Sequence, residues 1–347
     1  MNTPATDPIL IWGAGAIGAS LGAAFIGSGE EVVFVDAASD HVAAINARGL
    51  TITGPVAPRQ VLARAFLPDE VAGTYRRCIL AVKAHDTAAA VATLAQHVAA
   101  QGYVVSAQNG LNEEIIAARL GRERTIGCFV NFGADYLEPG VVLYGGRGAV
   151  VIGELEGAMT PRITELQVLF QTFEPAAIAT TNIWGYLWAK LTYAALVFAT
   201  ALTNDSIADV LAEQAYRPML TRLAREVVAV SRAEGIRLER FSGFDTSAFL
   251  PETTPAATAR GFDEMVAFNS KSAKTHSGVW RDLAIRKRRT EVDTQLGPIV
   301  EAGRRHGIPT PVTAGVISRI HEIEAGRRSL GRASLEELEA ITPESSS

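Results

Sequence analysis

A glycine-rich turn between an apolar strand and a helix-compatible segment constrains the fold of this 347-residue chain more than any other feature. The stretch ILIWGAGAIGASLG begins at Ile9 and has G-x-G-x-x-G spacing at Gly13, Gly15 and Gly18. In such a turn the first glycine permits a tight bend, the second lets a pyrophosphate approach the backbone, and the third lets the helix pack closely. Unpaired N–H groups at the helix N-terminus then bind phosphate. The pattern predicts a dinucleotide site formed by Gly13, Ala14, Gly15, Ala16, Ile17 and Gly18.

The same stretch also contains GASLG, a G-x-S-x-G match centred on Ser20. A hydrolase nucleophile at this serine would need the strained turn between strand and helix. The glycines upstream already occupy that turn, so the sequence favours the dinucleotide interpretation.

Short apolar runs alternate with longer helical patterns in the first half of the chain. The runs lie at residues 9–12, 32–35, 78–82, 103–107 and 125–130. Buried strands that alternate with helices are typical of a parallel sheet covered on both faces. We therefore predict an α/β Rossmann-type N-terminal domain over residues 1–180.

The pattern changes to amphipathic helices after about Thr180. Leu220, Leu223, Val227 and Val230 have the spacing of one helix face. Further helices are predicted over residues 291–306 and 313–326. These features predict an all-α C-terminal domain for substrate binding and dimerisation at residues 181–335, followed by a flexible tail at residues 336–347.

Composition and charge exclude several classes of function. The net charge of -5 gives no general attraction to nucleic acid, and the run RKRR at residues 286–289 is interpreted as a solvated face. Cys78 and Cys128 lie in apolar runs and are expected as buried thiols. No histidine pair has metal-ligand spacing, so we expect no metal. The N-terminus has no basic region followed by an apolar core, which favours a cytoplasmic location.

The second apolar strand ends in a carboxylate, Asp36, which lies 18 residues after Gly18 (36 − 18). A carboxylate at this place can accept hydrogen bonds from the adenosine ribose hydroxyls and repels the 2′-phosphate of NADP. We therefore expect NAD, with NADP as the alternative cofactor. The competing interpretation is that Asp36 caps the following helix, for which Ser39 and Asp40 are rival candidates.

Lys190 is the one full charge in the segment YLWAKLTYAALVFATAL, which begins at Tyr186. A bare ammonium is costly to desolvate. Three interpretations remain open for it: a side chain that snorkels to the surface, the flank of a membrane span, or a group placed for chemistry. The apolar run from Leu191 to Leu202 is shorter than the ~18 residues that a span requires, which favours a buried core helix.

Five motifs occur in the order seen in ketopantoate reductases, which the chain resembles from Ile9 to about Gly326. They are the glycine turn, LAVKAHDT around Lys83, SAQNG at Asn109, YLWAKL at Lys190 and RRTEVD at Glu291. The resemblance implies a Rossmann domain joined to a helical domain, with the substrate between them. It implies that Lys190 is the catalytic lysine and Glu291 a catalytic carboxylate. It also implies that Lys83 lies on the cofactor side and that Asn109 is a polar group at the nicotinamide or the substrate.

These roles agree with the chemistry of the residue types. A lysine at the entry of the first helix of the second domain can protonate the alkoxide formed in ketone reduction, or take the proton in alcohol oxidation. Glu291 can pair with Lys190 and bind the substrate hydroxyl. The structural alternatives are a snorkelling helix terminus for Lys190 and a first-turn helix charge for Glu291. For Lys83 the alternative is an ordinary loop lysine, and for Asn109 it is a turn residue before a glycine.

Departures from the family pattern bear on the substrate. Ketopantoate reductases usually have asparagines where this chain has Ala194 and the pair Val197 and Phe198. THSGVWRD replaces the usual serine-rich run, which leaves His276 and Ser277 as candidate polar substrate groups. A site that has lost polar partners rejects a substrate that needs them. We therefore expect a substrate that is bulkier or less polar than ketopantoate.

The sequence thus predicts an NAD-preferring oxidoreductase of the ketopantoate reductase family. It would transfer hydride between nicotinamide and a 2-keto or 2-hydroxy acid, or a related secondary alcohol. One alternative is an authentic NADPH-dependent ketopantoate reductase of pantothenate synthesis, and another is a non-catalytic dinucleotide-sensing protein. The expected partners are the small-molecule substrate and a second copy of the chain, without nucleic acid or membrane.

Overall fold

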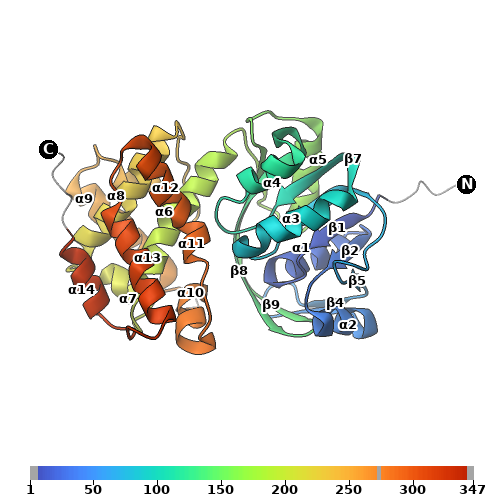
Figure 1. Cartoon of the computed structure of the whole chain (residues 1–347), viewed down its shortest axis with the longest axis horizontal. Helices are drawn as coiled ribbons and strands as arrows, with labels where there is room; N and C mark the ends of the chain where they lie inside the picture. Colours follow the sequence, from blue (N-terminus) through green and yellow to red (C-terminus); the bar gives the residue numbers. More distant parts are fainter. Residues whose placement is uncertain (1–6, 272–274, 342–347) are drawn as a thin grey trace, which may run out of the picture. The chain divides into compact units, whose positions relative to one another are not determined.

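The computed structural model describes residues 7–271 and 275–341 (Figure 1). The chain divides into two compact units, Met1–Ile183 and Trp184–Ser347. Each unit is described by itself below.

The first unit is built on a single ten-stranded sheet. The strand order is β4-β3-β9-β8-β7-β6-β1-β2-β5, and β10 pairs with β9. The strands are β1 (Ile9–Trp12), β2 (Val32–Val35), β3 (Leu50–Thr53), β4 (Arg59–Val61), β5 (Arg64–Phe66), β6 (Tyr75–Leu80), β7 (Val98–Ser106), β8 (Thr125–Glu138), β9 (Val141–Glu154) and β10 (Ile178–Ala179). All five apolar runs of the sequence form strands, namely β1, β2, β6, β7 and β8.

The prediction of a parallel sheet was wrong for one edge region. Strands β8 and β9 form a long antiparallel hairpin, and β3 pairs antiparallel with β4. The hairpin is joined by a tight turn at Pro139 and Gly140, where Gly140 has a φ of +79°. The strand β9 was missed because its sequence, VVLYGGRGAVVIGE, has glycines and an arginine in place of a continuous apolar run.

Helices cover both faces of the sheet, as expected of a Rossmann-type unit. They are α1 (Ala16–Gly27), α2 (Ser39–Arg48), α3 (Thr87–Leu94), α4 (Glu113–Leu120) and α5 (Pro161–Gln171), with short 3-10 turns at Ala84–Asp86, Ala95–His97 and Arg122–Arg124. Because side chains alternate along a strand, Ile9 and Ile11 of β1 pack with α1, α2 and α5. Leu10 and Trp12 point to the other face and pack with α3 and α4.

The second unit is helical, as predicted, and the described part of it has no strand beyond an isolated bridge between Phe241 and Phe244. The helices are α6 (Ile183–Thr200), α7 (Ile207–Ala212), α8 (Arg217–Ala233), α9 (Pro255–Asn269), α10 (Gly278–Arg281), α11 (Val292–Gln295), α12 (Gly297–His306), α13 (Pro311–Glu324) and α14 (Ala333–Glu339), with a 3-10 turn at Thr246–Phe249 and a π-helical turn at Asp282–Arg286. The amphipathic pattern in α8 is confirmed, since Leu220, Leu223, Val227 and Val230 are fully buried. The helix predicted over 291–306 is interrupted at Leu296, just before Pro298.

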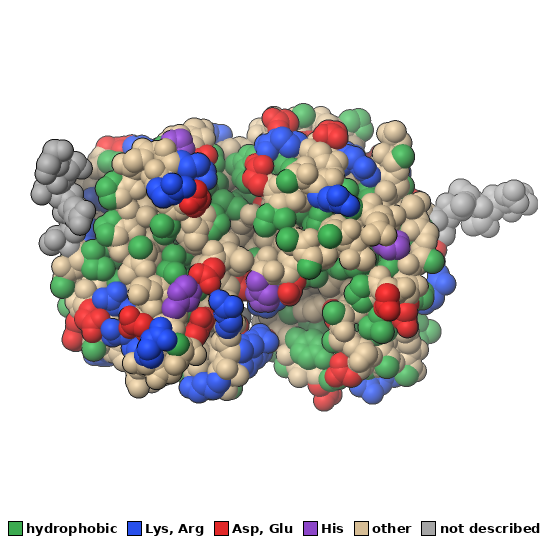
Figure 2. Space-filling model, in the orientation of Figure 1, with side chains coloured by type: hydrophobic (Ala, Val, Ile, Leu, Met, Phe, Trp, Pro, Cys, Tyr) green, Lys and Arg blue, Asp and Glu red, His purple; other side chains and the backbone are tan. Residues whose placement is uncertain are grey.

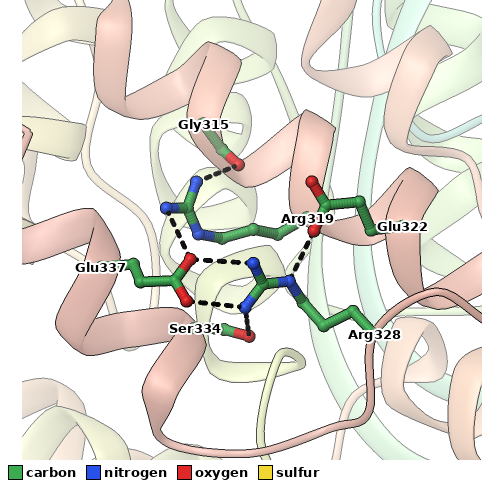
Figure 3. Close-up of polar contacts among 6 residues, drawn as sticks. All are labelled: Gly315, Arg319, Glu322, Arg328, Ser334 and Glu337. Carbon is green, nitrogen blue, oxygen red and sulfur yellow. Dashed lines mark hydrogen bonds and ion pairs between the residues drawn. The ribbon is translucent and has the colours of Figure 1, made fainter.

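The last helix, α14, extends into residues 336–347, which were expected to be a flexible tail. Its Leu335 and Leu338 are fully buried, which fixes it to the unit. Arg328 donates hydrogen bonds to Glu322 and to both carboxylate oxygens of Glu337, and Arg319 also bonds Glu337 (Figure 3). Residues 342–347 of the expected tail lie outside the described residues.

Basic and acidic side chains of the second unit lie intermixed on the face drawn in Figure 2. The run at residues 286–289 follows this pattern: Arg286 and Arg288 both pair with Asp282, and Arg289 pairs with Asp293. Such pairing is typical of a solvated face. No helix within 7–271 and 275–341 is long and apolar enough to cross a membrane.

Candidate functional site

The glycine turn has the geometry that a pyrophosphate requires. Gly13 has a φ of +101°, and a Cβ there would lie 2.8 Å from the backbone of Ala81. A Cβ on Gly18 would lie 1.9 Å from the carbonyl oxygen of Gly13, so the helix can pack this closely only with glycine. A Cβ on Gly15 would meet nothing within 4 Å, which leaves open space where the phosphates would approach.

Helix α1 begins at this turn, and no side chain of its own N-cap or first turn neutralises its positive end. Its N-cap is Gly15, which has no side chain to accept a hydrogen bond, and its first turn contains no acidic residue. The N–H groups there can therefore bind an anion. These features fit the pyrophosphate of a dinucleotide, and the binding role of residues 13–18 stays a prediction.

Asp36 lies beside the same turn, at the end of β2. Its Oδ2 accepts a hydrogen bond from the Ala14 N–H at 2.8 Å, and its Oδ1 accepts one from the Ala38 N–H at 3.0 Å. Each carboxylate oxygen has two lone pairs, so both can still accept a ribose hydroxyl. Ala38 is the N-cap residue of α2, so Asp36 also shapes the entry to that helix.

Lys83 and Asn109 lie in neighbouring loops at the carboxyl ends of β6 and β7. Lys83 is exposed and Asn109 is half-buried. The Gln108 side chain joins the two loops by donating to the Val82 carbonyl at 2.9 Å. Because β1 pairs with β6 and β6 with β7, the two loops and the glycine turn share one edge of the sheet. Ligands bind at this edge in open α/β sheets.

A buried polar cluster underlies these loops, and sequence reasoning missed most of it. Thr87 donates to Asn112, and Asn112 in turn donates to the Asn109 carbonyl at 2.7 Å. Glu113, the first residue of α4, is fully buried, with the Ser106 hydroxyl and the N–H groups at the start of α4 beside its carboxylate. Burial raises the pKa of Glu113 to about 7, although the N–H groups at the start of α4 and the Ser106 hydroxyl partly oppose this.

Lys190 is the eighth residue of the eighteen-residue helix α6. It therefore lies in the body of the helix and not at the entry that the sequence suggested, which removes the snorkelling-terminus interpretation. Lys190, Ala194 and Val197 are half-buried, whereas Leu187, Leu191 and Phe198 are buried. Spacing of four and then three residues places the first three on one helix face. This face contains two of the positions where the family usually has asparagine.

Glu291 lies immediately before α11 and is only 9% exposed. Its neighbour Thr290 donates both its backbone N–H and its hydroxyl to Oε1 of Glu324, at 2.7 and 2.8 Å. Glu324 is the last residue of α13. It thus fixes the turn that contains Glu291, a role that sequence reasoning missed because the two segments are 34 residues apart.

The other two predicted substrate residues are engaged in local structure. Ser277 is the N-cap of α10 and accepts a hydrogen bond from the Trp280 N–H at 3.0 Å. The Nε2–H of His276 donates to the Asn204 carbonyl at 3.1 Å, and its Nδ1 accepts from the Thr275 hydroxyl. Both ring nitrogens are therefore occupied, which favours a capping role for His276 over a substrate contact.

Aromatic rings surround Tyr193, which follows Lys190 by three residues, almost one helical turn, in α6. Tyr193 lies 5.4 Å from Phe244 and 6.1 Å from Phe241 between ring centroids. Phe244 in turn stacks on Phe249 at 5.7 Å. Tyr193 also donates its hydroxyl to Asn269 at 3.1 Å. The neighbourhood of the Tyr193 ring is thus largely aromatic.

The structure shows no cluster of three or more histidine, cysteine, aspartate or glutamate side chains that could hold a metal ion, within residues 7–271 and 275–341. Cys78 and Cys128 are buried free thiols, as expected.

Two protein-family models match this chain, one for each unit. The model of ketopantoate reductase PanE/ApbA matches residues 9–157, and the model of its C-terminal region matches residues 182–324. The chain belongs to the ketopantoate reductase family. Members of the ketopantoate reductase family are nicotinamide-dependent oxidoreductases that act on a CH–OH group, so this protein is an enzyme of that class.

Individual relatives of the family cover almost the whole chain. The 2-dehydropantoate 2-reductase of Archaeoglobus fulgidus is 28% identical over 319 residues, which is 92% of this chain and 98% of the relative. The PanE/ApbA family ketopantoate reductase of Ralstonia eutropha is 26% identical, with a TM-score of 0.78 over 92% of this chain and 99% of its own. D-mandelate dehydrogenase in complex with NADH and anilino(oxo)acetate shares the fold at 22% identity, with a TM-score of 0.79 and the same coverage.

Proposed function

We propose that this protein is an NAD-preferring oxidoreductase that interconverts a 2-keto acid and a 2-hydroxy acid, or a related secondary alcohol. The proposed substrate has a bulkier and less polar side chain than ketopantoate. The observation that carries this proposal is the half-buried face of α6, where Lys190 is followed by Ala194 and Val197. The face keeps the group for proton transfer and lacks hydrogen-bonding groups at the two following positions.

Lys190 and Glu291 are the proposed catalytic residues. The nicotinamide supplies or takes the hydride. The ammonium of Lys190 would donate a proton to the substrate oxygen in reduction, and the neutral amine would take it in oxidation. Glu291 would bind the substrate hydroxyl and pair with Lys190, and the Thr290–Glu324 hydrogen bonds would hold it in position. Lys83 and Asn109 are proposed to contact the cofactor, with Asn109 also near the substrate.

The aromatic cluster around Tyr193 supports a bulky substrate. Tyr193 follows Lys190 by three residues in α6, and its ring packs with those of Phe241 and Phe244. The similarity to D-mandelate dehydrogenase, whose complex contains anilino(oxo)acetate, supports an aromatic oxo acid as one candidate class. The second candidate function is reduction of ketopantoate itself with NADPH, which the names of the curated relatives favour.

Asp36 supports NAD over NADP. A carboxylate beside the ribose would repel the 2′-phosphate of NADP. We expect Asp36→Ala, combined with an arginine at the next position in place of Ala37, to shift the ratio of kcat/KM values towards NADPH. An unchanged ratio would contradict this assignment of Asp36.

A homodimer is also proposed, on the basis of large apolar side chains that the second unit exposes. Phe268 is 43% exposed and Ile285 is 66% exposed. Sedimentation of the purified protein would show a species of twice the chain mass. We propose a cytoplasmic location as well, which fractionation of the source cells would test.

The substrate proposal is tested by comparing turnover of ketopantoate with turnover of phenylglyoxylate and 4-methyl-2-oxopentanoate, each with NADH and with NADPH. Both of these acids lack the hydroxyl of ketopantoate, and phenylglyoxylate is also bulkier. We expect the two less polar acids with NADH to give the higher kcat/KM. Ala194→Asn restores the polar group usual in the family and should move the preference towards ketopantoate. Efficient turnover of ketopantoate with NADPH by the wild type would instead establish the second candidate.

A further inference from the structure

A buried histidine, His41, lies below the glycine turn and uses both of its ring nitrogens. It is the third residue of α2 and is 1% exposed. Its Nδ1 accepts a hydrogen bond from the Gly140 N–H at 2.9 Å. Its Nε2 lies 2.8 Å from the Ala14 carbonyl oxygen. Because a carbonyl oxygen only accepts, Nε2 carries the proton, and the imidazole is the neutral Nε2–H tautomer.

These two hydrogen bonds connect the glycine turn with the tip of the β8–β9 hairpin. The peptide groups of Ala14 are held from both sides, since its N–H donates to Asp36 and its carbonyl accepts from His41. The hairpin tip is held as well, because the Gly140 carbonyl accepts from the Thr51 N–H at 2.9 Å. Neither side can therefore move to replace a lost His41 bond without breaking another.

We propose that His41 is a positioning residue for the dinucleotide, and that its protonation weakens dinucleotide binding. The neutral imidazole holds Ala14, and with it the N–H groups of residues 15–18, in the conformation that receives the pyrophosphate. A protonated ring carries N–H groups on both nitrogens. Its Nδ1–H would then face the N–H of Gly140, and the link between turn and hairpin would break. The inference rests on the proposed binding of the cofactor at the glycine turn.

The charged and titratable groups near His41 come from three elements. Asp40 on α2 accepts the backbone N–H of His41, and Asp36 at the end of β2 bonds Ala14. From β8, the Tyr136 ring packs edge-on against His41 at 5.1 Å, and Glu138 lies near Tyr136. Arg48 at the end of α2 bonds the Pro139 carbonyl. None of these groups accepts a proton from Nδ1, because that atom faces the Gly140 N–H.

The experiment measures the Kd of NADH by fluorescence between about pH 5.5 and pH 8.5, the range in which a histidine titrates. It compares the wild type with His41→Gln and His41→Phe. A glutamine amide supplies one donor and one acceptor and does not titrate in this range. His306→Gln is the matched control, because His306 lies in the second unit, beside Glu234.

We expect the wild type and the control to lose about tenfold in NADH affinity towards acid pH, the loss typical of one broken hydrogen bond. His41→Gln should bind NADH with little dependence on pH, and His41→Phe should bind weakly at all pH values. The protection factor of the Gly140 amide against hydrogen exchange should fall in the wild type with the same midpoint.

A pH dependence in His41→Gln equal to that of the wild type would overturn the inference, since a group other than His41 would then control the affinity. Equal affinity of His41→Phe and wild type at neutral pH would overturn it as well. A wild type that binds neither NADH nor NADPH would instead refute the proposed function, so the two failures are distinguishable.

Discussion

Replacement of the buried Glu113 should change how the stability of the first unit depends on pH. Glu113 is 0% exposed, and burial raises its pKa from 4.5 to about 7. Each pKa unit corresponds to about 1.4 kcal/mol, so the ionised carboxylate destabilises the fold by about 3 kcal/mol relative to an exposed one. Glu113→Gln removes the ionisation and nearly keeps the side-chain volume.

The direction of this pH dependence follows from the pH at which the folded and the unfolded chain each lose the proton of Glu113. Below about pH 4.5 the carboxyl is protonated in both the folded and the unfolded chain, so its titration has no effect on stability. Between about pH 4.5 and pH 7 the unfolded chain releases the proton while the folded chain keeps it. The free energy of unfolding of the wild type should therefore fall as pH rises through this window, by up to about 3 kcal/mol. In Glu113→Gln this component of the fall should be absent.

The assay is urea denaturation at several pH values between about 5 and 8, followed by hydrogen exchange in peptides of β6 and β7. These strands belong to the same unit as Glu113. Glu114→Gln is the matched control, since Glu114 is exposed and pairs with Arg122 at 2.7 Å. We compare the slopes of the free energy of unfolding against pH. The glutamine amide can lack hydrogen-bond partners at every pH, which lowers the stability of the variant without changing this slope. Equal slopes for Glu113→Gln and the control would refute the reasoning.

Two further predictions concern the cofactor turn and the carboxylate of the second unit. Gly15→Ala should fold normally, because a Cβ there meets nothing within 4 Å, but it should lose NADH binding. Gly18→Ala should unfold at a lower temperature, because a Cβ there lies 1.9 Å from the Gly13 carbonyl oxygen. Thermal melts with NADH titrations would check both, and normal NADH affinity in Gly15→Ala would contradict the site. Glu324→Gln should lower kcat about tenfold without changing the Kd of NADH, because Thr290 then loses a charged acceptor beside Glu291. Steady-state kinetics would test this, and an unchanged kcat would exclude a positioning role.

The local signals in the sequence predicted much of the fold. Continuous apolar runs predicted the strands β1, β2, β6, β7 and β8, and the glycine spacing after β1 located the tight turn that the structure has there. The amphipathic spacing in α8 was equally informative. Each of these patterns belongs to a single strand, turn or helix, so residues that are close in the sequence are enough to predict it.

The features that were missed depend on contacts between distant segments. His41 bonds Gly140, which is 99 residues away, and Glu324 bonds Thr290 across 34 residues. Strand β9 forms because the turn at Gly140 folds it back on β8, although the segment GGRG at residues 145–148 interrupts its apolar sequence. The sequence around Glu113 does not distinguish it from the exposed Glu114, because the packing of α4 decides which of the two is buried.

The most direct test of the central claim is the rate of NADH oxidation with a bulky 2-keto acid, measured on the wild type and on Lys190→Ala with saturating NADH. If Lys190 supplies the proton, the variant should bind NADH normally and lose about a hundredfold or more in kcat. A Lys190→Ala enzyme that turns over at the wild-type rate would contradict the assignment of this lysine as the catalytic acid.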